Sequence, residues 1–151
     1  MKDVYFLDKE ELPTIPVPHD CPIKAILVED QNMVFVFEDD LTGYDTFARI
    51  QPQAKSLVIR YHFTERVRDY SIYKWMKPNL LNKDGCFKCM ADGFTNENQE
   101  TLVKLTESTL EYIDHYVSAY SRSFLIQLFS SSKNEILIEA DVDQIEFEWI
   151  L

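Results

Sequence analysis

The amino-acid sequence predicts an α+β fold that is mostly antiparallel β-sheet, with one or two helices in the 96–120 region. Apolar and polar residues alternate with a period of two along most of the chain, which is typical of half-buried strands. Apolar residues recur at helical spacing only after Gly93. With 151 residues and 46% hydrophobic content, the chain can bury a core without disulfides or metals, since folding at this size removes roughly 70% of the unfolded surface from water. We therefore expect residues 1–151 to form a single globular domain.

The first predicted elements are an extended segment and a hairpin. The segment 12–22 contains four prolines, so it cannot be a central strand, because proline has no backbone N–H to donate. Residues 22–29 and 33–38 both alternate apolar and polar side chains, and the polar tripeptide DQN separates them. This pattern predicts two antiparallel strands joined by a short turn.

Two aromatic strands are predicted in the middle of the chain, at 56–63 and 69–76. In the first strand, the odd-numbered residues from Leu57 to Phe63 share one face, while Arg60 lies on the other. The second strand follows closely, and we expect it to pair back with the first across TERVR. Their aromatic side chains also offer an alternative function, in which these strands are the interface of a structural or accessory subunit.

The region 96–120 carries the helical signals. The polar tetrapeptide NENQ is a possible helix start, and Leu102 and Leu105 follow at helical spacing. Four serine or threonine residues within 101–109 are indifferent helix formers and argue against one long helix. One or two helices are therefore expected here, and a strand over 101–106 is the competing interpretation.

Three strands are predicted at the C-terminal end, at 123–129, 135–142 and 144–150, and they should form an antiparallel meander. In the last of them, alternation separates an apolar face from a face that carries carboxylates. If the last two strands pair, four carboxylates crowd one solvent face. They are Glu139, Asp141, Glu146 and Glu148.

The charge of the chain is strongly acidic and unevenly distributed. A net charge of −11 argues against a nucleic-acid binder, because such a chain repels phosphate. Between Arg49 and Lys88, nine basic residues stand against three acidic ones, whereas no basic residue follows Lys133. Whether the basic segment neutralises the acidic end within the folded chain stays open at this point.

The acidic residues support two interpretations. Exposed carboxylates can serve solubility alone. They can also form a docking surface for a basic protein partner, because they raise the association rate and select against other partners. Exposed tyrosines such as Tyr44, Tyr73 and Tyr120 would then supply anchors. The candidate partner-binding residues are Glu139, Asp141, Glu146 and Glu148, with Glu38, Asp39 and Asp40 as a second cluster.

The stretch DGCFKCMADG has the Cys-x-x-Cys spacing of many metal and redox sites. Zinc would need four ligands at bonding distance, and the candidate set is Cys86, Cys89, Cys21 and His19. Two Asp-Gly turns bracket the stretch, however, and predict a short strand between them. Alternation along that strand would send the two thiols to opposite faces, with Cys89 in the core and Cys86 half exposed. A zinc-stabilised protein or metalloenzyme is therefore kept as an alternative, whereas a thioredoxin-type role would need a helix start at Cys86, which the sequence lacks.

No other pattern points to catalysis. Glu111 and His115 would share one face of a helix, which is typical of a surface ion pair. No serine lies in a Gly-x-Ser-x-Gly motif, and three scattered glycines cannot form a phosphate-binding loop. We therefore predict a protein that is not an enzyme and needs no cofactor. No apolar run approaches the ~20 residues of a membrane helix and no signal peptide is recognisable, so we expect a cytoplasmic location and no membrane partner.

Both ends of the chain resemble a known type of protein. The segments PHDCPIKAI and FVFEDD near the start, with FLIQLF and ILIEADVDQIEFEWI at the end, resemble small uncharacterised bacterial proteins of polymorphic-toxin loci, where such chains act as immunity proteins. The resemblance implies a cytosolic, non-enzymatic protein that binds a cognate toxin and blocks its active site or substrate groove. Immunity proteins that face nucleases are often acidic, because they compete with nucleic acid for a basic cleft. The resemblance implies no particular site residues.

Overall fold

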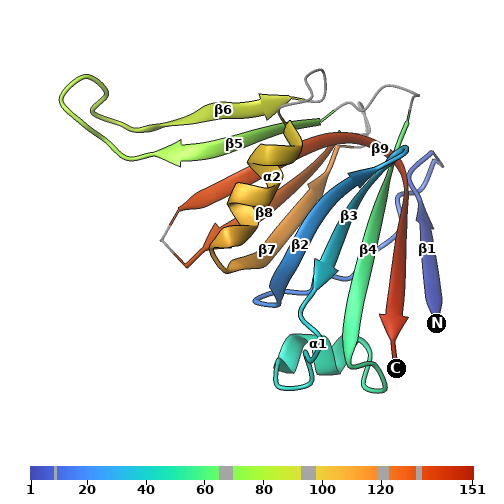
Figure 1. The fold of residues 1–151 in the computed structure, drawn as a ribbon. Coiled ribbons are helices and arrows are strands. Elements are labelled where there is room, and N and C mark those ends of the chain that lie inside the picture. The colour runs from blue at the N-terminus through green and yellow to red at the C-terminus, as the bar shows by residue number, and fades with distance from the viewer. Residues whose placement is uncertain (9, 65–69, 93–97, 119–122, 132–133) are drawn as a thin grey trace.

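The computed structural model describes residues 1–8, 10–64, 70–92, 98–118, 123–131 and 134–151. These residues form nine strands and two helices (Figure 1). The strands are β1 (Lys2–Phe6), β2 (Pro22–Glu29), β3 (Asn32–Phe37), β4 (Ser56–Phe63), β5 (Tyr70–Met76), β6 (Cys86–Asp92), β7 (Leu110–Val117), β8 (Ser123–Ser130) and β9 (Glu135–Ile150). The helices are α1 (Asp45–Ile50) and α2 (Asn98–Glu107). Within these residues, no helix has the length and apolar character needed to cross a membrane.

The described strands belong to one antiparallel sheet, in the order β4-β3-β2-β7-β8-β9-β5-β6. β4 also pairs with β9, so the sheet closes on itself through the C-terminal half of β9. The N-terminal half of β9 lies between β8 and β5, and its C-terminal half lies between β4 and β1. β5 and β6 run out beyond the closed part as a hairpin (Figure 1). The predicted mostly antiparallel sheet is confirmed.

β9 corrects the predicted C-terminal meander, because one strand of 16 residues replaces two. The register with β4 pairs His62 with Gln144. The next pair joins Phe63 to Val142, so Asp143 is an extra residue, a bulge in β9. Buried positions accordingly change from even to odd numbers after the bulge. A bulge accommodates one extra residue without a turn, so the chain continues as one strand. The two acidic halves of β9, which were predicted to pair side by side, therefore lie end to end.

β7 replaces the second predicted helix. α2 confirms a helix in the first part of the 96–120 region, and the competing strand over 101–106 is wrong because those residues lie in α2. From Leu110 onward the chain pairs with β8, and the backbone N–H of Tyr112 donates to the loop before β2. Glu111 and His115 therefore lie on a strand, and their predicted pairing on a helix face is wrong.

The partners of β5 also differ from the prediction. β5 pairs with β9 and β6, not with β4. Both edges of β4 are taken by β3 and β9, which leaves no edge for β5. The hairpin of β2 and β3 is confirmed, and so is the strand between the two Asp-Gly turns, which is β6. β1 and α1 are elements that the sequence prediction omits.

The interior of the closed sheet is one cluster of buried apolar and aromatic side chains. Two of the largest are Tyr61 and Tyr112, whose hydroxyl oxygens lie 3.0 Å apart. The Tyr112 hydroxyl also lies 2.7 Å from Nδ1 of His115. Burial raises the pKa of both tyrosines, so both stay neutral and can hydrogen-bond to each other. The core thus holds a short polar chain whose members are satisfied by one another.

Lowering the pH from 7.5 to about 5 is expected to destabilise the protein through His115. Burial lowers the pKa of His115 below its ordinary value of 6.5, although the Asp114 carboxylate and a backbone hydrogen bond with Ile15 oppose the change. Between the folded and the ordinary pKa the unfolded chain binds a proton that the folded protein does not. The contribution of neutral His115 is therefore complete above about pH 6.5 and is lost as the pH falls toward the folded pKa.

Urea unfolding across this pH range measures the effect, with His115→Asn as the comparison. We expect the free energy of unfolding to fall more steeply in the wild type than in the variant as the pH drops below 6.5. Parallel slopes in the two proteins would contradict the assignment to His115.

Candidate functional site

The acidic residues of β9 fall into two environments. Glu139, Asp141, Glu146 and Glu148 lie on the outer face of the strand, because the residues that flank them directly, such as Ala140 and Phe147, are buried. The first and last of these lie roughly 30 Å apart along the strand, at about 3.3 Å per residue. The predicted face is therefore present, but it is a line along one strand and not a compact cluster.

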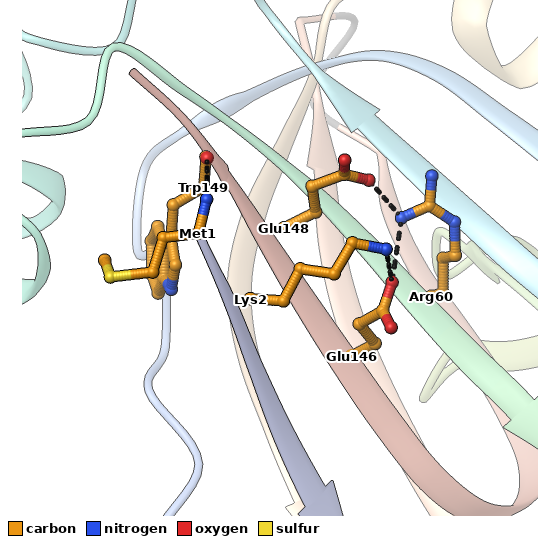
Figure 2. A network of polar contacts seen from close by, with 6 residues as sticks. All are labelled: Met1, Lys2, Arg60, Glu146, Glu148 and Trp149. Carbon is orange, nitrogen blue, oxygen red and sulfur yellow. Dashed lines mark hydrogen bonds and ion pairs between the residues drawn. The ribbon is translucent and has the colours of Figure 1, made fainter.

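The second half of this line is neutralised within the chain (Figure 2). Nζ of Lys2 lies 2.9 Å from Oε1 of Glu146, and Nη1 of Arg60 lies 3.2 Å from the same oxygen. The guanidinium of Arg60 also donates to Oε2 of Glu148, and this hydrogen bond lowers the pKa of the Glu148 carboxyl. Two carboxylates thus share two cations, and little negative charge is left for a partner.

Strand pairing explains this arrangement. Arg60 on β4 lies directly opposite Glu146 on β9, and Lys2 on β1 lies directly opposite Glu148. Opposite charges at facing positions of neighbouring strands attract each other. The sequence left open whether the basic 49–88 segment neutralises the acidic end of the chain. At this place it does, because Arg60 of that segment pairs with Glu146 and Glu148.

The first two residues of this line, Glu139 and Asp141, border a polar hollow. The hollow has a volume of about 320 Å³ and is lined by Ser71, Tyr73, Ser123, Glu139, Ala140 and Asp141. Ser71 on β5 faces Glu139, and Ser123 on β8 faces Asp141. Oγ of Ser123 lies 3.4 Å from Oε1 of Glu139, whereas no basic group in the described ranges forms an ion pair with Glu139. Glu139 is exposed on the outer face of β9.

An outer aromatic stripe, which consists of Tyr73, Trp75 and Phe87, extends from this hollow along the hairpin. Tyr73 lines the hollow, and Trp75 follows two residues later on the same face of β5. Trp75 is paired across the strands with Phe87 on β6, with ring centroids 5.1 Å apart. Gly85 has a φ of +72°, and a Cβ there would lie 2.5 Å from the Trp75 ring, so glycine lets the indole pack over the turn. Carboxylates and aromatic rings therefore share one surface.

Of the other two predicted tyrosine anchors, Tyr44 does not belong to this surface. Tyr44 is half-buried and packs against the core beside α1. Tyr120 lies outside the described residues. The sequence indicates Tyr73 but not Trp75, Phe87 or the two serines, because their shared face depends on the pairing of β5 with both β6 and β9.

The second predicted acidic cluster lies elsewhere. Glu38, Asp39 and Asp40 follow β3 near α1, at the far end of the molecule from the β5–β6 hairpin (Figure 1). Nζ of Lys24 lies 2.9 Å from the Asp39 carboxylate. Asp40 accepts hydrogen bonds from the hydroxyl and the backbone N–H of Thr42, which lower the pKa of its carboxyl. Asp40 therefore orders the loop before α1, and only Glu38 is exposed without such a contact in the described residues.

The three cysteines lie in different environments. Cys86 and Cys89 are both exposed on β6, so the prediction of a core Cys89 is wrong. β6 is the last strand of the sheet order and belongs to the projecting hairpin, where Cys86 and Cys89 stay exposed. Cys21 is fully buried, and burial together with the Asp20 charge raises the pKa of its thiol to about 12. His19 directs Nδ1 at the backbone oxygen of Ile113, 2.7 Å away.

Within the described residues, no three histidine, cysteine, aspartate or glutamate side chains come together as a possible metal-binding group. Within these residues, the four candidate zinc ligands Cys86, Cys89, Cys21 and His19 are therefore not brought together as one site. Comparisons of the chain with protein-family models, with curated proteins and with solved structures find no match.

Proposed function

We propose that this protein is a non-enzymatic protein-binding domain of the immunity-protein type, which docks a basic segment of its partner in the cytoplasm. The docking surface is the hollow with Glu139 and Asp141 together with the outer aromatic stripe. The observation that carries the proposal is the exposed Glu139, which contacts a serine hydroxyl but no cation in the described residues. In contrast, Glu146 and Glu148 are already paired with Arg60.

The chemistry of this surface fits arginine or lysine side chains. An arginine entering the hollow would exchange water for charge-assisted hydrogen bonds with the carboxylates. The faces of Tyr73 and Trp75 beside the hollow would attract a second cation, because aromatic rings carry negative charge on their faces. Buried aromatic anchors supply much of the affinity of protein interfaces, while carboxylates steer the approach of a basic partner.

Charge reversal at Glu139 tests the proposal. We expect Glu139→Lys to weaken binding of the cognate toxin by at least about 10-fold, which corresponds to roughly 1.4 kcal/mol, and to flatten its salt dependence. Binding is measured by calorimetry with purified proteins at two salt concentrations.

Asp39→Lys is the matched control, since Asp39 is 85% exposed and lies between β3 and α1 instead of in the hollow. It makes the same change in net charge and should leave the affinity nearly unchanged. An equal loss in both variants would show a general charge effect, and no loss in Glu139→Lys would remove the hollow from the interface.

A further inference from the structure

A second cavity lies on the inner side of the β5–β6 hairpin, between the hairpin and α2. It has a volume of about 280 Å³. It is lined by Lys74, Met90, Thr101, Lys104, Leu105, Ser108, Ser130, Asn134 and Ile136. The lining thus combines two lysines, three hydroxyl groups and one amide with three apolar side chains, and it includes no carboxylate. For a chain with a net charge of −11, this is an unusual concentration of positive charge.

Strand register adds a third lysine to this side. Lys74 lies directly opposite Ile136 on β9, and Ile136 is 2% exposed and belongs to the core. On its other edge Lys74 lies directly opposite Lys88 on β6. Residues that face each other across strands project from the same face of the sheet, so both lysines project on the inner side.

This pair of lysines is unfavourable in the protein alone. Like charges directly opposite each other on neighbouring strands repel and destabilise the sheet. In the described parts of the chain, no carboxylate forms an ion pair with Lys74, Lys88 or Lys104. The facing positions of the two lysines are therefore an observation independent of the cavity, and a bound anion would relieve the repulsion expected between them.

α2 closes the cavity from the other side. Thr101, Lys104 and Leu105 lie at helical spacing and share one face of α2, whereas Ser108 directly follows the last residue of the helix, and α2 contacts β6. Lys104 also borders a shallow depression with Glu100 and Glu107, so part of its charge is balanced on the helix. Lys74 and Lys88 are consequently the residues on which a test should depend.

We propose that this cavity binds a small organic anion, whose acidic head group lies among the lysines and hydroxyls. Its short apolar part would pack against Met90, Leu105 and Ile136, which form the apolar part of the lining. The head group would supply the counter-charge that the described residues lack on this side. The site lies on the opposite face of β5 from the hollow with Glu139 and does not depend on the proposed function.

The test uses the full chain and three sodium salts at equal ionic strength, namely chloride, phosphate and hexanoate. Phosphate offers a head group alone, and hexanoate offers a head group with an apolar chain. We expect hexanoate to raise the Tm of the wild type in a saturable manner, by more than phosphate, with chloride as the reference. In calorimetry, Lys74→Met should weaken hexanoate binding at least 10-fold, because it keeps the apolar stem and removes the charge.

Lys88→Glu separates this site from a purely structural role of the lysines. It replaces a repelling pair with an attracting one, so the Tm in chloride should rise, while the stabilisation by hexanoate should disappear. Lys55→Met, an exposed lysine in the loop before β4, should keep the full response to hexanoate. An absent hexanoate response in the wild type, or an equal response in the wild type, Lys74→Met and Lys88→Glu, would overturn the proposal.

Discussion

Replacing Phe124 by alanine is expected to lower the free energy of unfolding by about 3–5 kcal/mol. The Phe124 side chain is fully buried inside the closed sheet. Its ring centroid lies 5.3 Å from that of Tyr61 and 4.9 Å from that of His115. Tyr61 and His115 belong to the polar chain through Tyr112, so they cannot move freely to fill the space that the ring leaves. The loss should therefore include both the transfer of the ring and the cavity.

Phe129→Ala is the matched control for this prediction. Phe129 lies on the same strand as Phe124 but is 39% exposed on the other face. Its removal should cost about 1 kcal/mol or less, since less apolar surface is lost and no closed cavity forms. Urea unfolding of both variants at pH 7.5 gives the comparison. Similar losses in the two variants would mean that the interior of the sheet is not packed as described.

Replacing Trp149 by alanine is expected to cost about 3–5 kcal/mol as well, and to release β1 from the sheet. Trp149 is 3% exposed and contacts the rings of Phe47 in α1 and Phe147 in β9, with centroids 6.1 Å and 5.4 Å away. Its indole Nε1 donates to Oδ2 of Asp3 at 2.7 Å. Its backbone oxygen accepts a hydrogen bond from the N-terminal amino group of Met1 (Figure 2), and its backbone N–H donates to the Met1 oxygen. One side chain thus joins α1, β1 and the closing strand.

Trp149→Phe separates the two parts of this effect. Phenylalanine keeps most of the apolar contact but cannot donate to Asp3, so we expect a loss of about 1 kcal/mol. Amide hydrogen exchange should show faster exchange in β1 (Lys2–Phe6) for Trp149→Ala than for Trp149→Phe, measured against the wild type. Equal protection of β1 in all three proteins would contradict the role assigned to Trp149.

The acidic residues show how far a candidate site can be predicted from sequence. Alternation correctly places Glu139 and Glu146 on the outer face of β9. It cannot distinguish them further, because the difference between them comes from Arg60 on β4 and Lys2 on β1, which are far away in sequence. Replacing Glu146 by lysine should accordingly lower the Tm, because the new lysine would face Arg60.

The sequence by itself determined the strands whose signal is local. Alternation and turn residues predict the hairpin of β2 and β3, the aromatic strand β4 and the strand β6 between two Asp-Gly turns. They also predict the buried face of β9. These features depend on neighbouring residues along the chain, and a side-chain period of two is visible without knowing the partner strand.

Only the tertiary structure decided which strands meet. Three features depend on which strand edges are free when the sheet closes. They are the continuation of β9 past Asp143, the strand β7 in place of a second helix, and the position of β5 between β9 and β6. Those pairings also decide the charges, because they place Arg60 opposite Glu146 and Lys74 opposite Lys88. Attraction in the first pair and repulsion in the second arise between residues on different strands, and the order of residues along one chain does not contain that information.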